Sequence, residues 1–265
     1  MCAVVFPDFS AFSDLADFSA LSDFFPFVED FRYADPTLES IQAQGGDDVC
    51  AVMVELIQGE GGVRPLDKAM VQALAKLCQE KDWLLLVDEV QTGIGRTGTL
   101  FAYQQFDIQP DVVSFAKGIA GGLPLGGILA SEKCATVLTP GTHGSTFGGN
   151  PVVCAGANVV VDRMDQSFLA NVNERAVQLR AGIAKLPHVK SISGIGLMVG
   201  IEFYDLKAAD VLAACREAGL LVLTAKTRLR LLPPLTLSEH DVDMALEILS
   251  DVLGKMEPTA PKEQA

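Results

Sequence analysis

The chain has 265 residues and a formal net charge of −14 at pH 7, with 49% hydrophobic and 20% charged residues. This composition is typical of a globular protein that buries a large core in one or two domains. The acidic balance argues against a nucleic-acid partner or an anionic membrane surface. No apolar stretch approaches the ~20 residues that span a bilayer.

Six cysteines are scattered along the chain, with no C-x-x-C pair and no nearby histidine. This spacing predicts free thiols in a reducing compartment rather than a zinc site or a disulfide framework. The start also lacks a basic region followed by an apolar one, so we expect no secretory signal and a cytoplasmic protein.

Residues 1–30 are unlike the rest of the chain because they contain no Lys or Arg and carry a near repeat, DFSAFSD at 8–14 and DFSALSD at 17–23. Their apolar residues recur every third position, a period that drifts off one face of a helix. We interpret the segment as an atypical, low-complexity start, aberrant or truncated. The alternative interpretation is a partner-binding segment.

Residues 31–163 alternate strand and helix patterns, which predicts parallel strands joined by right-handed crossovers. The glycine-rich segments 58–62 and 139–150 are expected to be loops. The predicted helices are 35–43, 65–82 and 151–164, and the predicted strands are 49–54, 84–87, 112–116 and 125–130.

Residues 164–256 predict a smaller α+β domain, followed by a disordered tail at 257–265. Ser238 is the expected N-cap of the last helix, with Asp241 three residues further on. The predicted helices are 166–186, 207–218 and 238–255, and the predicted strands are 189–192, 197–203, 220–224 and 229–232.

Two charged residues directly follow apolar strands. Asp88 ends the run Leu84–Val87, and Lys117 follows the run 112–116. Ligands of open parallel sheets lie beyond the carboxyl ends of the strands. An acid and an amine there suit pyridoxal phosphate, because a lysine bonds its aldehyde and a carboxylate pairs with its ring nitrogen. The alternative is a turn-capping Asp88 and a solvated Lys117.

Four ordered blocks resemble the class III pyridoxal-phosphate aminotransferases: VELIQGEGG at 54–62, VDEVQTGIGRTG at 87–98, FAKG at 115–118 and HGSTFGGNP at 143–151. The resemblance covers residues 31–253. It implies an α/β protein of PLP-transferase fold type I. A mainly parallel large domain, incomplete here, would be joined to a small C-terminal α+β domain.

The resemblance also implies the roles of individual residues. Lys117 would carry the cofactor, Asp88 would pair with its ring nitrogen, and Gln91 would hydrogen-bond its 3-hydroxyl oxygen. Ser145 and Thr146 match positions that reach the cofactor phosphate of the other subunit, which implies a homodimer. The alternative for that loop is an ordinary polar surface loop.

Glu60 and Arg230 match a pair that lets these enzymes accept two unlike substrates. Glu60 would mask Arg230 when the amino donor binds, and Arg230 would bind a carboxylate of 2-oxoglutarate. The alternative is that Arg230 is a surface arginine beside a strand.

Within the class, RTGTLFA at 96–102 and LRLLPPLT at 229–236 are most similar to members that act on N-acetylornithine. The implied activity is transfer of its amino group to 2-oxoglutarate in arginine biosynthesis. A class III enzyme for ornithine, 4-aminobutyrate or succinyl-diaminopimelate remains an alternative.

Two departures from the family pattern qualify this expectation. Leu56 stands where members usually have proline, and more than about a hundred N-terminal family residues find no match, including the segment that binds the cofactor phosphate. A truncated, non-catalytic binding subunit is therefore the third alternative.

Overall fold

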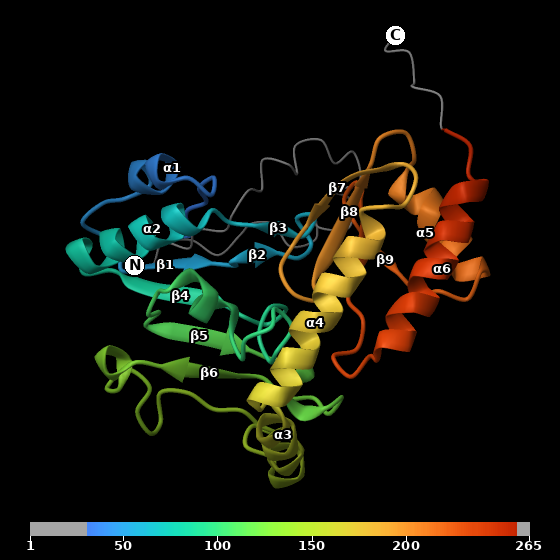
Figure 1. The fold of residues 1–265 in the computed structure, drawn as a ribbon. Helices are drawn as coiled ribbons and strands as arrows, with labels where there is room; N and C mark the ends of the chain where they lie inside the picture. Colours follow the sequence, from blue (N-terminus) through green and yellow to red (C-terminus); the bar gives the residue numbers. More distant parts are fainter. Residues whose placement is uncertain (1–30, 259–265) are drawn as a thin grey trace. The chain divides into compact units, whose positions relative to one another are not determined.

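The computed structural model describes residues 31–258, so the interpretations of residues 1–30 and 259–265 lie outside it. The described chain forms two compact units, each coloured along the sequence in Figure 1. Unit 1 comprises 31–56, 66–94 and 101–163, and unit 2 comprises 57–65, 95–100 and 164–258. Two short segments that precede residue 164 thus belong to unit 2.

Unit 1 contains a four-stranded sheet in the order β1-β4-β5-β6. The first three strands, β1 (Ala51–Val54), β4 (Leu84–Asp88) and β5 (Val112–Phe115), are parallel, and β6 (Gly127–Ala130) is antiparallel to β5. The predicted parallel pairing across the first crossover is confirmed, with Ala51 opposite Leu84.

The crossover helix α2 (Lys68–Lys81) packs against β4 through a buried face of Val71, Leu74, Leu77 and Cys78. Its expected start at residue 65 is wrong, because Pro65 belongs to a short strand and pairs with Ile57. The helix begins after Asp67, whose side chain accepts a hydrogen bond from the Met70 amide at 2.8 Å and so satisfies one free N–H group. The remaining helical segments of unit 1 are α1 (Leu38–Ala43), η4 (Ala102–Phe106), η5 (Lys117–Ala120), η6 (Glu132–Cys134) and α3 (Pro151–Arg163).

Unit 2 is built on a second sheet, in the order β7-β8-β10-β9, with antiparallel neighbours throughout. Three helices and this sheet share one apolar core, in which Ile183, Ile201 and Leu229 are fully buried. The strands are β7 (Val189–Ser193), β8 (Val199–Phe203), β9 (Leu223–Ala225) and β10 (Arg228–Leu231), and the helices are α4 (Gln166–Ile183), α5 (Ala208–Glu217) and α6 (Glu239–Lys255).

Two predictions for unit 2 have different outcomes. The capping box at the start of α6 is confirmed, since Ser238 and Asp241 exchange hydrogen bonds. The strand expected at 220–224 begins only at Leu223, because the chain is still closing α5. The Leu220 amide donates to the Cys215 carbonyl at 2.8 Å, and Gly219 adopts φ +86°, a conformation that favours glycine.

A hairpin of β2 (Ile57–Gln58) and β3 (Arg64–Pro65) also belongs to unit 2. It was expected only as a loop, because two-residue strands give no periodic pattern. Ile57 and Val63 are fully buried against Met198 and Ala225, so the hairpin has its own apolar anchor on unit 2.

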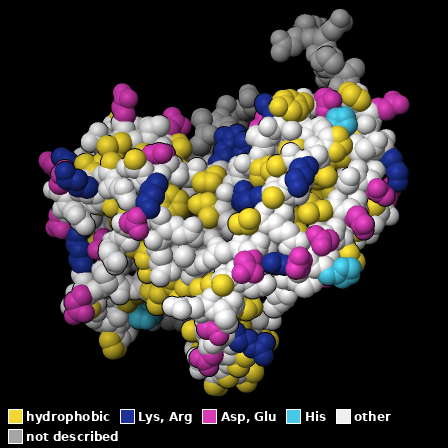
Figure 2. Space-filling model, in the orientation of Figure 1, with side chains coloured by type: hydrophobic (Ala, Val, Ile, Leu, Met, Phe, Trp, Pro, Cys, Tyr) yellow, Lys and Arg dark blue, Asp and Glu magenta, His cyan; other side chains and the backbone are white. Residues whose placement is uncertain are grey.

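Unit 1 exposes several large apolar side chains, on its outer strand β6 and in the segment from there into α3. The β6 residues Ile128 and Leu129 are about half exposed, and Phe147 and Val152 are 83% and 70% exposed. Apolar side chains are visible around the α3 end of unit 1 in Figure 2. Contiguous exposed apolar surface commonly marks an interaction site.

Candidate active site

Asp88 and Lys117 come to the same edge of the unit 1 sheet. Asp88 is the last residue of β4 and lies opposite Ser114 on the neighbouring parallel strand β5. Lys117 begins η5, two residues after β5 ends at Phe115. Because parallel strands end on one side of a sheet, both groups lie at the edge where ligands of such sheets bind.

The Asp88 carboxylate is half-buried and is oriented by its own surroundings. Its Oδ1 accepts hydrogen bonds from the Val90 amide at 2.9 Å and from the Ser114 hydroxyl at 3.2 Å. Within residues 31–258 no hydrogen bond reaches Oδ2. One carboxylate oxygen is therefore fixed, and the other remains available to a cationic ring nitrogen.

Lys117 has an exposed side chain and a backbone φ of +52°. For a residue with a side chain, this left-handed conformation costs roughly 1–3 kcal/mol, and such residues concentrate at functional sites. No ion pair of Lys117 is present in the described part of the chain. The amine is therefore not committed to a structural contact.

Glu89 organises the turn that carries Gln91. Its buried carboxylate accepts hydrogen bonds from the Tyr103 amide at 2.8 Å and from the Thr92 hydroxyl. Burial raises the pKa of the Glu89 carboxyl, and the hydrogen bond from Thr92 acts against this shift. No separate role for Glu89 is predicted from the sequence. A hydroxyl residue three positions after an acid at a strand end was the available signal.

Ser145 and Thr146 are not brought to Asp88 by the structure. Both are exposed, and the only hydrogen bond shown for the Ser145 hydroxyl is a local one that it accepts from the Gly148 amide at 3.0 Å. Within the described chain, no hydrogen bond of the Thr146 hydroxyl is present. Both hydroxyls are thus open to a group outside this chain.

Glu60 and Arg230, 170 positions apart in the sequence, meet within unit 2. Arg230 Nη1 donates to Glu60 Oε1 at 2.6 Å. Arg230 lies on β10 opposite Gly200 and is only 7% exposed, whereas the Glu60 side chain at the hairpin tip is 71% exposed. Arg230 Nε is buried with no hydrogen-bond partner in the described residues. A buried, incompletely paired guanidinium is suited to binding a further carboxylate.

Arg96 was also quoted only as part of a motif. Its Nη1 donates to the carbonyls of Leu197 at 3.2 Å and Pro233 at 2.5 Å, so it braces the turn that follows β10. Burial lowers the pKa of Arg96 to about 10. The residue holds the end of the strand that carries Arg230.

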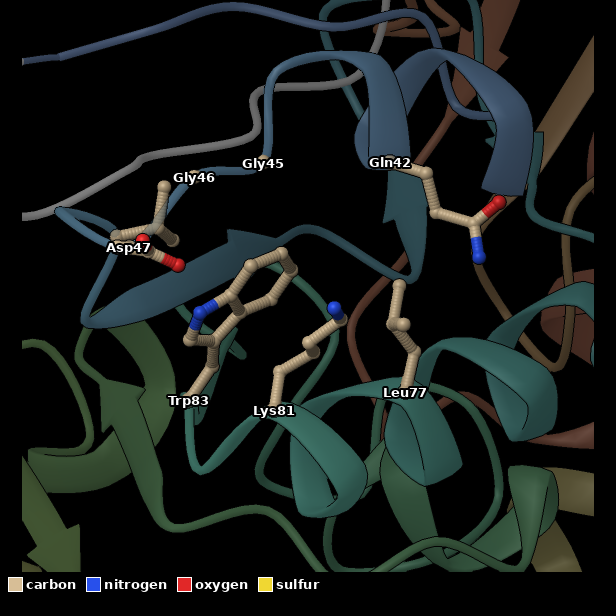
Figure 3. A pocket seen from close by; sticks show the side chains of 8 residues that line it. Gln42, Gly45, Gly46, Asp47, Leu77, Lys81 and Trp83 are labelled. Atoms are coloured by element: carbon tan, nitrogen blue, oxygen red, sulfur yellow. The ribbon is translucent and has the colours of Figure 1, made fainter.

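A cavity of about 490 Å³ lies elsewhere in unit 1, beside Trp83 at the beginning of β4 (Figure 3). Asp88 is at the other end of that strand, so the cavity is separate from the candidate site. Its lining residues are Gln42, Gly45, Gly46, Asp47, Val49, Leu77, Lys81 and Trp83.

Other kinds of site find little support in the described chain. Residues 31–258 contain no group of three or more His, Cys, Asp or Glu side chains that would hold a metal ion. None of the described helices has both the length and the hydropathy that a bilayer crossing requires. The cysteines in this range, Cys50, Cys78, Cys134, Cys154 and Cys215, are all free thiols.

Comparison with known proteins assigns the family. The family model "Aminotransferase class-III" matches residues 22–253, and the chain belongs to this family. Class III aminotransferases use pyridoxal phosphate, and the fold is their PLP-transferase fold type I.

Two similar relatives are named acetylornithine aminotransferases. The chain is 50% identical over 235 residues to the acetylornithine aminotransferase of Haemophilus ducreyi, covering 88% of this chain and 60% of that protein. An acetylornithine aminotransferase of Bordetella parapertussis is 46% identical over 220 residues, or 80% of this chain and 56% of that one. The chain thus spans about 60% of the length of such relatives.

Solved structures agree with this family assignment. An N-acetylornithine aminotransferase from Stenotrophomonas maltophilia aligns with a TM-score of 0.79 and 32% identity, over 96% of this chain and 65% of that one. An ornithine aminotransferase from Toxoplasma gondii aligns with a TM-score of 0.85 and 30% identity, over 95% and 64%. A second structure of the Toxoplasma enzyme is described as having partial occupancy of PLP at its active site.

Proposed function

We propose that this chain provides the catalytic lysine and the carboxylate-binding arginine of a transaminase. The enzyme would move the amino group of N-acetylornithine to 2-oxoglutarate in arginine biosynthesis. The observation that carries the proposal is the placement of Asp88 and Lys117 at one edge of adjacent parallel strands. The amino donor is taken from the names of the Haemophilus and Bordetella relatives.

The residues of this edge fit pyridoxal phosphate. Lys117 would hold the cofactor through its uncommitted amine, and the free oxygen of Asp88 would pair with the ring nitrogen. Gln91 follows in the turn fixed by Glu89 and is proposed to contact the ring's 3-hydroxyl oxygen. When bound, the cofactor supplies an electron-poor ring that stabilises negative charge at the substrate carbon.

Two side chains of this chain then have distinct tasks at the reacting atoms. Once the incoming amine has displaced it from the cofactor, Lys117 Nζ would take a proton from the substrate carbon and later return one, a role that typically contributes about 10²–10⁴-fold to rate. The Asp88 carboxylate would pair with the ring nitrogen and so favour the protonated form of the ring.

Glu60 and Arg230 are proposed to select the substrates. With the donor bound, the contact at 2.6 Å neutralises Arg230. With 2-oxoglutarate, the exposed Glu60 would move into solvent, and Arg230 would bind a carboxylate through the Nη1 group that Glu60 releases. Movement of Glu60 costs little because its side chain is already largely hydrated.

We also propose a homodimer with shared sites, in a cytoplasmic location. Two hydroxyls, on Ser145 and Thr146, would reach the cofactor phosphate of the other subunit, and the exposed apolar surface at Phe147 and Val152 would supply interface area. The cytoplasmic location is supported by the free thiols of the described chain. Sedimentation of the full chain tests the dimer, and a monomer at micromolar concentration would contradict it.

The decisive experiment is a visible-range spectrum of the purified chain with pyridoxal phosphate. We expect an absorption band that borohydride removes by fixing the cofactor on Lys117, as peptide mass spectrometry would show. Lys117→Ala should lack both the band and the modified peptide. The matched control is Lys81→Ala, an exposed lysine of the same unit beside the separate cavity, which should keep both. A band that survives Lys117→Ala would overturn the assignment.

Two other functions stay within reach of this experiment. Ornithine as donor is favoured by the Toxoplasma ornithine aminotransferase, which aligns with a TM-score of 0.85. Turnover with N-acetylornithine compared with ornithine or 4-aminobutyrate separates these substrates. A non-catalytic binding subunit is favoured by the partial coverage of the relatives, and the absence of any band in the wild-type chain would support it.

A further inference from the structure

A second arginine on β10 contacts the same hairpin loop that carries Glu60. Arg228 Nη1 donates to the Gly62 carbonyl at 3.1 Å and to the Ser193 hydroxyl at 2.8 Å, and Nη2 donates to Glu202 Oε2 at 3.3 Å. Arg228 and Arg230 are two positions apart on one strand and therefore project from the same face of the sheet. One arginine holds the loop backbone, and the other holds the Glu60 side chain of that loop.

The loop lies so close to the sheet that it leaves no room for side chains beneath it. A Cβ on Gly200, the residue opposite Arg230, would come within 2.9 Å of Val63 Cβ and 3.2 Å of the Gly62 carbonyl. Gly62 itself has φ +104°, which favours glycine. The backbone at Gly62 is therefore set by its contacts with β8 and β10. Gly62 lies two residues after Glu60.

The two arginines differ in how completely their N–H groups are used. Arg228 reaches a carbonyl, a hydroxyl and a carboxylate, whereas Arg230 reaches Glu60 and retains a buried, unpaired Nε in the described structure. The three hydrogen bonds described for Arg228 all go to groups of unit 2. Its contacts are those of a brace, and those of Arg230 are those of a binding residue.

Glu202 keeps Arg228 in place. Its carboxylate also accepts hydrogen bonds from Lys190 at 2.7 Å and from the Ser191 hydroxyl at 2.8 Å. These bonds lower the pKa of Glu202 to about 2, so its charge persists at any physiological pH. Arg228 thus stands between the Glu202 carboxylate and the Gly62 carbonyl.

We propose that Arg228 is a positioning residue for substrate selection, because it fixes the loop from which Glu60 reaches Arg230. This inference rests on the proposed substrate switch. With the backbone held at Gly62, only the Glu60 side chain has to move when the substrate changes. Without Arg228 the loop is looser, Glu60 meets Arg230 less often, and Arg230 is less well masked.

The expected effects of losing Arg228 have opposite signs for the two substrates. A less masked Arg230 binds 2-oxoglutarate more tightly, by about 2- to 5-fold if the lost masking equals that of one exposed ion pair. The KM of the amino donor rises by a similar factor, because the donor must now tolerate an unpaired cation. General damage to unit 2 would instead weaken both.

The test compares Arg228→Met with Arg228→Lys, which keeps one donor for the Gly62 carbonyl. The control is Lys190→Met, which removes another partner of Glu202 without touching the loop. Hydrogen exchange at the Val63 amide, which donates to the Gly59 carbonyl at 3.3 Å, reports on the loop. We expect several-fold faster exchange in Arg228→Met, partial rescue in Arg228→Lys and no change in Lys190→Met.

Calorimetric titration of the full chain with 2-oxoglutarate is the second measurement. Tighter binding in Arg228→Met, matching Glu60→Gln, supports the proposal, and weaker or unchanged binding overturns it. If the wild-type chain does not bind 2-oxoglutarate, the proposed switch fails. The exchange arm still decides the positioning role, since unchanged Val63 exchange in Arg228→Met overturns it independently.

Discussion

The unit 1 sheet edge with Asp88 and Lys117 and the Glu60–Arg230 pair of unit 2 differ in how far their side chains are buried and paired within this chain. At the unit 1 edge, Lys117 is exposed and has no ion pair in residues 31–258, and the outer strand β6 exposes Ile128 and Leu129. In unit 2, Arg230 is buried and already paired with Glu60. The unit 1 edge that carries Lys117 is therefore open, whereas the Glu60–Arg230 pair of unit 2 is already formed.

The difference follows from what covers each sheet. The unit 2 sheet shares its core with α4, α5 and α6, and the hairpin packs in a separate apolar cluster with Met198 and Ala225. Contacts inside this unit therefore determine the geometry of Arg230. The unit 1 sheet leaves apolar surface uncovered, and the relatives are longer than this chain. Substrate selection should accordingly depend on unit 2, whereas cofactor chemistry should also depend on groups outside the described residues.

Among the proposed variants, Arg230→Ala is expected to have the largest effect, because it removes the paired arginine of unit 2. Loss of a buried charged partner of a carboxylate typically costs about 2 kcal/mol or more, or roughly 30-fold in affinity. We expect that loss for 2-oxoglutarate and a smaller change in the KM of the donor. Stability should change little on the Glu60 side, because its side chain is 71% exposed.

Steady-state kinetics and calorimetry measure both ligands of Arg230→Ala. Arg216→Ala, an exposed arginine in α5, is the matched control and should leave both values unchanged. Equal losses for donor and 2-oxoglutarate would show that Arg230 binds both alike, and the preformed selection site would then be rejected.

An intermediate effect is expected from Gly200→Ala, which sharpens the claim that the hairpin rests directly on the sheet. The added Cβ would lie 2.7 Å from the Ser193 hydroxyl and 2.9 Å from Val63 Cβ, so the hairpin must shift. Overpacking of this kind costs about 1–3 kcal/mol of unfolding free energy. Urea unfolding measures the cost, and Val63 hydrogen exchange should rise in parallel.

The control for Gly200→Ala is Gly254→Ala in α6, where a Cβ would meet nothing within 4 Å. Alanine is favoured over glycine within helices by roughly 0.5–1 kcal/mol, so this variant should not lose stability. If Gly200→Ala proves as stable as Gly254→Ala, the loop is not seated on the sheet as described.

Much of the fold was predictable because its elements have clear local signals. The apolar run at Leu84–Val87, the period of α2 and the Ser238 cap each predict their element and are observed. The same signals bring Asp88 and Lys117 to the ends of neighbouring strands. Their roles in binding cofactor stay predictions, as do those of Gln91, Ser145 and Thr146.

The remainder depends on contacts between distant residues. The hairpin of β2 and β3 has two-residue strands, and Ile57 and Val63 are buried in one apolar cluster with Met198 and Ala225, which lie far away in the sequence. The role of Arg228 was equally hidden, since its partner Gly62 lies 166 positions away. The sequence predicts an arginine in a strand, but it does not indicate which distant carbonyl group accepts the hydrogen bond from that arginine.

The smallest expected effect is on the stability of the fold at acid pH. It tests Glu202, the partner of Arg228, separately from Arg230. Hydrogen bonds from Lys190 and Ser191 hold the pKa of Glu202 at about 2, below its ordinary value of 4.5. The depressed value means that the ionised form stabilises the folded state. This contribution is present above pH 4.5 and is lost as the pH falls towards 2.

Glu202→Gln should therefore lower the unfolding free energy by up to about 1 kcal/mol at pH 6, the size of effect that partly exposed ion pairs have. Near pH 2 the variant should differ less from wild type. Urea unfolding across this pH range measures the difference. Glu217→Gln, an exposed acid at the end of α5, should show no such convergence. Binding of 2-oxoglutarate to Glu202→Gln should shift in the same direction as in Arg228→Met, because Arg228 loses the carboxylate that steadies it. A parallel pH dependence of wild type and Glu202→Gln would mean that Glu202 carries no structural charge, and the brace would then depend on the Ser193 and Gly62 contacts alone.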